Sequence, residues 1–490
     1  MSAKFENDLL TILNPITNNA VETFKVSDRV SIEKMINDAK VDNTWSSLSL
    51  NKRCYYINRL RKALVKNKDI LHKTLKDETG KTDFDILIEI FTTLEHLKEI
   101  TKIAKKALKN SSRSSGLMKV KKAYVKYEPL GVAGVISPWN YPLATPITSA
   151  VEALLAGNKV ILKPSEHTPM TSILVKKIWD ENIGFNNSFQ ILIGGGEIGQ
   201  VIVESKNIDI ICFTGSTAVG KKIASECAKT LKPNLLELGG KDPMIILKDA
   251  NLNRSVESAL FGGMSNSGQT CISTEEVFIE SPIYDKFVDK ISKRIKTLRS
   301  GEDKSSDLGS MIMPENTSKV NRHIKEARES CHIVQGNAED REMFIPPTLV
   351  IEPQDNLSIV NEETFGPVIS LRSFSNENEL LEKIHKTGYG LSASIFGKDN
   401  SRIHNIIKNI KTGNVSINDV LTHYGIASIP FGGEGLSGVG RMHGKEGLRS
   451  LCRIKSVVEN RFNFINEMWW FGRSKKIEFL LDKAIKLLYR

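Results

Sequence analysis

The spacing of apolar residues changes near residue 130. Before that point, apolar positions recur at helical spacing and predict helices over 29–78 and 84–109. A polar loop over 110–116 follows, and the alternation of apolar and polar residues over 120–127 predicts one strand of an edge hairpin. We therefore expect the first part of the chain to be mainly helical.

From residue 131 onward, short apolar runs alternate with segments of helix length. The predicted strands are 132–136, 159–162, 189–193, 208–213, 244–247 and 276–279. The predicted helices between them are 147–156, 171–180, 198–204, 252–264 and 285–298. Parallel strands that are buried on both faces read as continuous apolar runs, and helices connect them. The pattern predicts an α/β fold with two doubly wound domains, whose strand-and-helix units continue to about residue 418.

Length and composition agree with a globular protein of several domains. The chain has 490 residues, which is too long for one ordinary core, and 40% of them are hydrophobic and 26% charged. No run of about 18 apolar residues occurs, so we expect no membrane-spanning helix. The N-terminal sequence MSAKFENDLL has no apolar core flanked by basic residues, so secretion is not expected.

The cysteines and the net charge argue against several classes of protein. The six cysteines are scattered and form no CxxC pair, which argues against a zinc site or a disulfide framework and favours a reducing compartment. The net charge is +11, but the chain has no basic motif interleaved with aromatic residues of the RNA-binding kind. We therefore expect no metal, no nucleic-acid partner, and a cytoplasmic location, either free or at a membrane surface.

Cys271 is the candidate nucleophile. It follows a Gly-containing turn in Ser-Asn-Ser-Gly-Gln-Thr-Cys, and Glu237 lies 34 residues upstream in Leu-Glu-Leu-Gly-Gly-Lys. A thiol after such a turn can attack a carbonyl carbon, and a glutamate can act as the base. Read alone, however, a free cysteine is more often a small buried hydrophobic residue, and Asn140 is equally a turn residue before Pro142.

Four further motifs accompany Cys271 and Glu237. They are Pro-Trp-Asn at 138–140, Lys-Pro-Ser-Glu at 163–166, Phe-Thr-Gly-Ser at 213–216 and Glu-Glu-Thr-Phe-Gly-Pro at 362–367. With these motifs in this order, the chain resembles the aldehyde dehydrogenase superfamily from about residue 25 to residue 460. The resemblance implies a small-molecule aldehyde as substrate and a homodimer or homotetramer. It also implies an NAD-binding domain of 1–110 and 130–239, a catalytic domain of 240–436, an antiparallel oligomerisation flap of 111–129 and 449–460, and a C-terminal tail of 461–490.

Two charged residues after a predicted strand indicate cofactor chemistry. Lys163 follows the apolar run 160–162, and Glu166 lies three residues further on. Sheets of α/β proteins present ligands at the carboxyl ends of their strands, where a cation and an acid suit the hydroxyls of an adenosine ribose. A carboxylate repels a 2′-phosphate, so we expect NAD as the cofactor, with NADP as the alternative. A loop salt bridge between Lys163 and Glu166 is the competing interpretation.

The segment 215–220 opens a predicted helix whose N–H groups can bind a pyrophosphate, although a simple turn explains it equally well. The resemblance implies that Glu363 holds the nicotinamide ribose and that Phe365 positions the ring. From the residues alone, these two are equally a turn acid and a core aromatic. The predicted cofactor-binding residues are Ile136, Pro138, Trp139, Lys163, Glu166, Gly196, Phe213, Gly215, Ser216, Gly220, Leu238, Glu363 and Phe365.

The resemblance also implies a reaction path. The Cys271 thiolate attacks the aldehyde, hydride leaves to the nicotinamide, and Glu237 activates the water that hydrolyses the thioester. The Asn140 amide and the Cys271 backbone N–H bind the oxyanion. Many members of the superfamily have a second glutamate after a Gly-Arg pair, where this chain has Met442, so a proton relay through that acid is missing. A CoA-acylating relative and a catalytically silent scaffold are the competing interpretations.

The tail over 461–490 contains seven basic and three acidic residues, a charge of +4. Trp469 and Trp470 precede a segment with an apolar helical face, a pattern typical of membrane-interface helices. Docking on the protein's own body or on a partner subunit is the competing interpretation. With this tail, the chain resembles the plant and fungal membrane-associated branch of the superfamily.

The resemblance places the substrate tunnel near Tyr141, Ile272 and Tyr424. These side chains favour medium or long aliphatic aldehydes, or aromatic ones. No Arg or Lys is obviously placed in the sequence to bind a second carboxylate or a phosphate.

Overall fold

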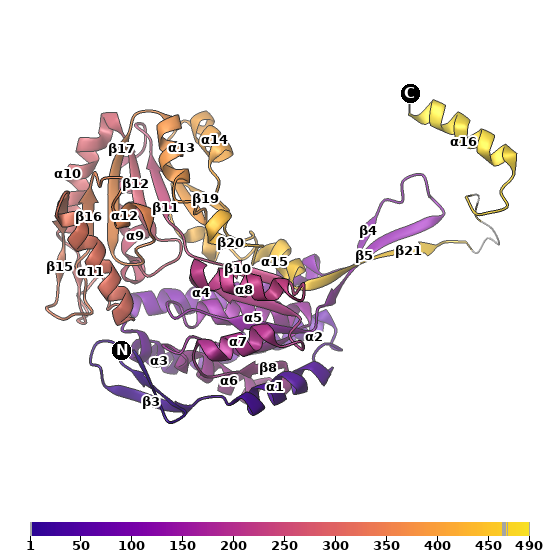
Figure 1. The fold of residues 1–490 in the computed structure, drawn as a ribbon, viewed down its shortest axis with the longest axis horizontal. Coiled ribbons are helices and arrows are strands. Elements are labelled where there is room, and N and C mark those ends of the chain that lie inside the picture. The colour runs from indigo at the N-terminus through magenta and orange to yellow at the C-terminus, as the bar shows by residue number, and fades with distance from the viewer. Residues whose placement is uncertain (1, 463–466, 468, 490) are drawn as a thin grey trace. The chain divides into compact units, whose positions relative to one another are not determined.

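The computed structural model describes residues 2–462, 467 and 469–489. The chain divides into two compact units, one formed by Met1–Leu108 and Glu128–Arg453 and the other by Lys109–Tyr127 and Ile454–Arg490. The larger unit contains two mainly parallel sheets with helices packed on their faces (Figure 1). This architecture confirms the predicted α/β class, while the predicted cofactor and catalytic domains both fall within the larger unit.

The first sheet is built from the strands predicted between residues 132 and 214, with two additions. Its strands are β6 (Val132–Ile136), β7 (Lys159–Lys163), β8 (Phe189–Ile191), β9 (Ile210–Thr214), β10 (Asn234–Glu237) and β20 (Gly438–Val439), in the order β20-β10-β9-β6-β7-β8. Only the β10–β20 pair is antiparallel. The connecting helices are α5 (Ala144–Ala156), α6 (Met170–Asn182), α7 (Gly196–Glu204) and α8 (Thr217–Ala228). Every residue of β6 and β7 is buried, which explains their continuous apolar runs.

The register of this sheet brings predicted site residues to one edge. Ile136 pairs with Lys163 on one side and with Phe213 on the other, and Thr214 pairs with Glu237. Because the four strands are parallel, these residues all lie at their carboxyl ends, where α/β folds bind ligands.

The second sheet has seven strands in the order β14-β16-β17-β12-β11-β18-β19. Their bounds are β11 (Asp242–Ile246), β12 (Thr274–Glu280), β14 (His332–Gln335), β16 (Thr348–Ile351), β17 (Val368–Phe374), β18 (Ser392–Phe396) and β19 (Asn414–Ile417). Alternate residues of β11 enter different apolar clusters, with Met244 and Ile246 in one and Ile245 in the other. The sheet is therefore covered on both faces, as expected for a doubly wound fold.

Helices and two short strands complete this half of the larger unit. The helices are α9 (Leu252–Met264), α10 (Tyr284–Ile295), α11 (Pro314–Arg328), α12 (Ser358–Asn361), α13 (Glu377–His385) and α14 (Asn400–Asn409). Helix α15 (Gly444–Ser450) instead packs against α5 of the other half. Strands β13 (Arg299–Ser300) and β15 (Asn337–Ala338) pair with each other in parallel.

The predicted helical stretch 29–78 is three helices rather than one. They are α1 (Arg29–Val41), α2 (Leu50–Lys66) and α3 (Lys68–Thr79), followed by α4 (Asp83–Ala107). The Asp28 carboxylate accepts the N–H of Ser31 and caps α1, and the Ser49 hydroxyl accepts the N–H of Lys52 and caps α2. The Ser49 cap marks the break between α1 and α2, whereas no side chain caps the start of α3.

A three-stranded antiparallel sheet precedes α1 and was not predicted. Its strands are β1 (Ala3–Glu6), β2 (Leu9–Leu13) and β3 (Ala20–Lys25). Only β2 buries apolar side chains, namely Leu10, Ile12 and Leu13, whereas β1 and β3 are polar and largely exposed. A single short apolar run carries too little periodic signal to identify a sheet.

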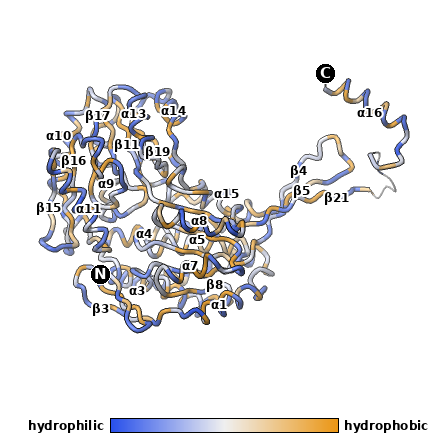
Figure 2. The backbone as a smooth tube through the Cα atoms, in the orientation of Figure 1, coloured by the Kyte–Doolittle hydropathy of each residue, from blue (hydrophilic) through white to orange (hydrophobic). Residues whose placement is uncertain are grey.

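The smaller unit contains most of a three-stranded sheet and the C-terminal helix. Strands β4 (Ser111–Arg113), β5 (Lys121–Pro129) and β21 (Cys452–Asn460) form a sheet in the order β21-β5-β4, and β4 and β5 are antiparallel. Helix α16 (Lys475–Leu488) has alternating apolar and polar stretches (Figure 2). Residues 463–466, 468 and 490 of the predicted tail lie outside the described residues. Among the helices that the structure describes, none is both long and apolar enough to cross a membrane.

Candidate active site

A cavity of about 560 Å³ lies within the larger unit and brings the three predicted catalytic residues together. Asn140, Glu237 and Cys271 all line it. Seven of the predicted cofactor-binding residues line the same cavity: Pro138, Trp139, Gly215, Ser216, Leu238, Glu363 and Phe365. All the motifs that were identified separately in the sequence, except Lys-Pro-Ser-Glu at 163–166, therefore meet at this cavity.

A strained turn positions Cys271. Asn266 and Ser267 have left-handed backbones, with φ of 53° and 54°, and Gly268 has φ of 70°. A Cβ on Gly268 would lie 2.0 Å from the carbonyl oxygen of Gly366, so only glycine fits there. The turn directs the chain into the cavity just before the thiol, and Cys271 itself is half-buried.

The Asn140 amide lies against the same turn. Its Nδ2 donates to the carbonyl oxygen of Gln269 at 2.9 Å, and Asn266 Nδ2 donates to the carbonyl oxygen of Asn140 at 3.2 Å. An amide nitrogen carries two hydrogens, so one donor of Asn140 stays available to a ligand. Asn140 is thus suitably built to donate a hydrogen bond to an oxyanion formed next to Cys271.

A buried ion pair fixes the loop that carries Asn140. Glu89 Oε1 accepts the backbone N–H groups of Leu143 at 2.8 Å and Ala144 at 3.1 Å, and its Oε2 lies 2.6 Å from Lys81 Nζ. Lys81 Nζ also lies 4.1 Å from the ring centre of Tyr141. The loop from Asn140 to the start of α5 is therefore held at several points.

A second buried ion pair fixes the turn that carries Glu363 and Phe365. Glu275 accepts the backbone N–H groups of Thr364 and Phe365 at 2.9 Å and lies 2.5 Å from Lys241 Nζ. Phe365 has φ of 57°, an unusual conformation that these bonds stabilise. Its ring lies edge-on to Trp139 with the ring centres 5.4 Å apart.

Glu237 differs from these acids because neither carboxyl oxygen has a hydrogen-bond partner among the described residues. It ends β10 and is buried. Burial raises the pKa of Glu237 well above its usual value, although the Arg441 guanidinium opposes this. Glu237 is therefore a carboxyl group with both oxygens free to exchange a proton in the cavity.

The same environment favours the protonated form of the Cys271 thiol. Burial raises the pKa of the Cys271 thiol, and the carboxylates of Asp242, Glu237 and Glu363 raise it further. On the cofactor side, burial and the Glu275 carboxylate raise the pKa of Glu363 to about 7, although its carboxylate accepts the N–H of Gly240 at 3.0 Å. A positive charge bound beside Cys271 would therefore favour its thiolate.

Six predicted cofactor residues do not line the cavity. They are Ile136, Lys163, Glu166, Gly196, Phe213 and Gly220. Lys163 and Glu166 form an ion pair of 3.1 Å, as the competing interpretation held, and Gly220 lets α8 approach Leu238, whose Cδ2 would lie 2.4 Å from an added Cβ. Gly196 begins α7. The structure gives packing or pairing roles to several of these positions.

Asn316, Lys319 and His443 are among the cavity-lining residues that the sequence analysis did not single out. Asn316 and Lys319 come from α11, and His443 precedes α15. Asn316 Nδ2 donates to the carbonyl oxygen of Phe365 at 2.7 Å. Lys319 is a cavity-lining lysine, and its charge acts on Glu363. No local motif marks these residues, because only the packing of distant helices brings them to the cavity.

Comparison with known proteins identifies the aldehyde dehydrogenase family over almost the whole chain, as the sequence motifs predicted. The model of the aldehyde dehydrogenase family matches residues 3–457. A 4,4′-diapolycopene aldehyde oxidase of Methylomonas sp is 31% identical over 469 residues, which are 95% of this chain and 88% of that protein. A putative succinate-semialdehyde dehydrogenase (NADP(+)) of Mycolicibacterium smegmatis is 32% identical over 425 residues, 85% of this chain and 82% of that protein.

Solved structures of aldehyde dehydrogenases resemble this chain over nearly its whole length. Betaine aldehyde dehydrogenase from Staphylococcus aureus in complex with NAD+ is 29% identical with a TM-score of 0.87, covering 95% of this chain and 94% of that one. A putative aldehyde dehydrogenase from Burkholderia cenocepacia has a TM-score of 0.88 at 26% identity, covering 93% of this chain and 97% of that one. The chain therefore belongs to the aldehyde dehydrogenase family and oxidises an aldehyde to a carboxylic acid, with NAD or NADP as the hydride acceptor.

Proposed function

We propose that the protein is a hydrolytic, NAD-preferring dehydrogenase of apolar aldehydes, with Cys271 as nucleophile, Glu237 as base and Asn140 as oxyanion donor. One observation carries this assignment: the thiol, an amide with a spare donor and an unpaired carboxyl group line the same cavity. The neighbouring carboxylates Glu89 and Glu275 are instead fully engaged with backbone N–H groups. Of these three carboxyl groups, only Glu237 has no hydrogen-bond partner among the described residues, and it is the one to which we assign proton transfer.

Each group has one task in the reaction. The bound cofactor supplies the hydride acceptor and a positively charged ring beside the thiol. Cys271 Sγ forms a bond to the carbonyl carbon, and Asn140 Nδ2 and the Cys271 backbone N–H stabilise the oxyanion. Collapse of the oxyanion releases hydride and leaves a thioester on Cys271. Glu237 then takes a proton from the attacking water, the C–S bond breaks, and the acid leaves.

The residues around the cavity fit a nicotinamide dinucleotide. Gly215 and Ser216 line it at the N-terminus of α8, where free N–H groups suit a pyrophosphate. Burial disfavours ionisation of Glu166, but the Lys163 ammonium beside it holds its pKa below the usual value. A carboxylate in that position repels a 2′-phosphate, which supports NAD over NADP. The ratio of kcat/KM for the two cofactors tests this, and Glu166→Ser is expected to raise the relative use of NADP.

The substrate side supports an apolar aldehyde. Ile88, Phe261 and Ile426 line the cavity yet are exposed, so they stand at its opening. Lys319 lines it too, but its charge acts on Glu363, on the side assigned to the cofactor. We expect kcat/KM to rise with aliphatic chain length and to exceed that for succinate semialdehyde. Ile426→Asp should reduce activity on long aldehydes more than on short ones.

The smaller unit supports two proposals about partners. The sheet of β4, β5 and β21 mediates a homodimer or homotetramer, and light scattering on the purified protein measures the assembly. The tail, including α16 and the tryptophans at 469 and 470, holds the cytoplasmic protein at an anionic membrane surface, as in the plant and fungal membrane-associated branch. Deletion of 461–490 should abolish co-sedimentation with anionic vesicles, and unchanged sedimentation would refute the membrane role.

The decisive test of the reaction type is product analysis. With aldehyde, NAD and water alone, the protein should produce NADH and free carboxylic acid in equal amounts. A requirement for CoA, with an acyl-CoA as product, would instead identify a CoA-acylating enzyme. Cys271→Ala serves as the control, and equal signals from both proteins would exclude catalysis at this cavity.

A further inference from the structure

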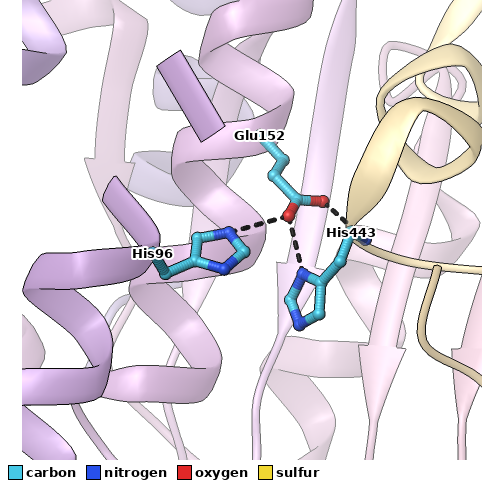
Figure 3. A group of neighbouring side chains, drawn as sticks. All are labelled: His96, Glu152 and His443. Carbon is cyan, nitrogen blue, oxygen red and sulfur yellow. Dashed lines mark hydrogen bonds and ion pairs between the residues drawn. The ribbon is translucent and has the colours of Figure 1, made fainter. Parts of the chain in front are cut away.

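A buried cluster of three side chains lies beside the catalytic cavity. His96 from α4, Glu152 from α5 and His443 from the segment before α15 point toward one another (Figure 3). All three are almost completely buried. Glu152 Oε1 lies 2.9 Å from His96 Nε2 and 2.7 Å from His443 Nδ1, and Glu152 Oε2 accepts the backbone N–H of His443 at 3.1 Å.

The cluster fixes which ring nitrogens carry hydrogen. Burial opposes the ionisation of Glu152, but the two histidines and their hydrogen bonds prevail and lower its pKa to about 2. An ionised carboxylate only accepts, so His96 Nε2 and His443 Nδ1 must both donate to it. A neutral imidazole protonated at Nδ1 has a bare lone pair at Nε2. His443 Nε2 is buried and has no hydrogen-bond partner among the described residues.

Only one member of the cluster reaches the cavity. His443 lines it together with Cys271 and Glu237, whereas His96 and Glu152 do not. Its ring packs edge-on against Tyr424, with the ring centres 5.3 Å apart. Tyr424 itself packs against the apolar cluster that Cys271 also borders. The network therefore runs from Glu152 inside the protein to an imidazole at the catalytic cavity.

Proton stoichiometry calls for a second acceptor there. Oxidation of an aldehyde with NAD and water gives NADH, a carboxylate and two protons. Cys271 gives up its thiol proton when it attacks and regains a proton when the thioester is hydrolysed, so both released protons come from the water. Glu237 can hold only one proton at a time. The residue directly before His443 is Met442, which cannot accept a proton.

We propose that His443 is the second proton acceptor of this cavity, with Glu152 as its positioning residue. A proton released in the cavity binds His443 Nε2, and the Glu152 carboxylate stabilises the imidazolium that forms. The proton passes to solvent before the next turnover, which restores the neutral ring. This role rests on the proposed function of Cys271 and Glu237 and supplies the relay that Met442 cannot.

Hydrogen bonding accounts for the cluster without a metal ion. The three ligand atoms lie within 4.8 Å of one another, which a cation could bridge. Both ring nitrogens, however, already lie at hydrogen-bond distance from the same carboxylate oxygen. A bound metal is therefore the outcome that the experiment must exclude.

The test compares His443→Gln with the matched variant His96→Gln, since both replace a buried histidine bonded to Glu152. We expect His443→Gln to lower kcat about 10²-fold and to remove one limb of its pH profile, because general acid–base groups contribute at least this much. His96→Gln should keep that limb and stay within about threefold of the wild-type kcat. Glu152→Gln should shift the limb to lower pH, because the imidazolium loses its counter-charge. Thermal unfolding of each variant reports on folding.

A second measurement covers the case in which His443→Gln folds poorly. In His443→Ala, added imidazole should restore kcat, which a purely structural role would not allow. An unchanged pH profile in His443→Gln, equal losses in both glutamine variants, no rescue by imidazole, or one metal ion per chain in the purified protein would each overturn the proposal. Each of these outcomes would leave NADH production by the wild-type protein intact. If the proposed function itself were wrong, the wild-type protein would produce no NADH from aldehyde, NAD and water.

Discussion

Buried carboxyl groups in the walls of the cavity and in the loops around it differ in how many partners they have. Glu89 and Glu275 each accept two backbone N–H groups and pair with a buried lysine. Glu363 accepts one backbone N–H, and Glu237 has no partner among the residues that the structure describes. Glu237 is therefore the member of this set that has no bond to hold it in place.

This difference separates supporting residues from reacting ones. A buried carboxylate with every lone pair engaged has little freedom to move or to accept a proton. A buried carboxyl group without partners is unfavourable unless a ligand completes it. Glu89 and Glu275 therefore hold the two motif loops in place, while Glu237 is reserved for substrate or water.

The largest effect is expected at the nucleophile. Cys271→Ala should reduce acid formation by at least about 10⁴-fold, because loss of a covalent nucleophile removes the whole path. Cys331, which is also half-buried but does not line the cavity, provides the matched control. Steady-state NADH production measures both variants. Comparable activity in Cys271→Ala and Cys331→Ala would mean that the cavity is not the site of reaction.

The next largest effect is expected at the oxyanion donor. Asn140→Ala should lower kcat by about 10²–10³-fold with little change in substrate KM, because the donor acts mainly on the charged intermediate. Asn140→Asp keeps the size but removes the donor, so it should be at least as impaired. An aspartate variant with near-normal kcat would show that shape, and not hydrogen bonding, is what Asn140 contributes.

The supporting acids should affect stability more than chemistry. Lys81→Met leaves Glu89 as an unpaired buried charge and should lower the free energy of unfolding by about 3–5 kcal/mol. Lys73→Met removes an exposed ion pair of similar length with Asp77 and should change it by less than about 1 kcal/mol. Denaturant titration of the two variants compares them directly. Equal destabilisation would contradict the supporting role of the buried pair.

The smallest effect is expected at Glu363, whose pKa is raised to about 7 by burial and by Glu275. As the pH rises through 7, the carboxyl group ionises and becomes a pure acceptor for ribose hydroxyls, so the KM for the cofactor should fall severalfold. Glu363→Gln cannot ionise and should lose this pH dependence. A cofactor KM that varies with pH equally in both proteins would assign the titration to another group.

The sequence indicated residues that line the cavity better than it indicated the residues that support them. Cys271, Glu237 and Asn140 lie in recognisable motifs, and buried strands such as β6 and β7 appear as continuous apolar runs. Lys81 and Glu89 carry no such signal, because isolated charged residues in or beside a helix usually belong to its solvated face. Their burial depends on the packing of α4 against α5, which local sequence does not encode.

Other parts were missed for related reasons. The N-terminal sheet has only one strand with buried apolar residues, and the stretch 29–78 is divided by breaks, one of them capped by Ser49, that leave its periodicity intact. Lys319 and His443 reach the cavity from elements distant in sequence. Tertiary packing, rather than local pattern, decides each of these features.

The central claim is that the unpaired carboxyl group of Glu237 activates the water that hydrolyses the thioester. Rapid mixing of Glu237→Gln with aldehyde and NAD, followed by intact-mass analysis, tests it most directly. The claim predicts one rapid equivalent of NADH per active site, an acyl group that persists on Cys271, and steady-state turnover slowed by about 10²-fold or more. Normal turnover without an accumulated acyl-enzyme would contradict it.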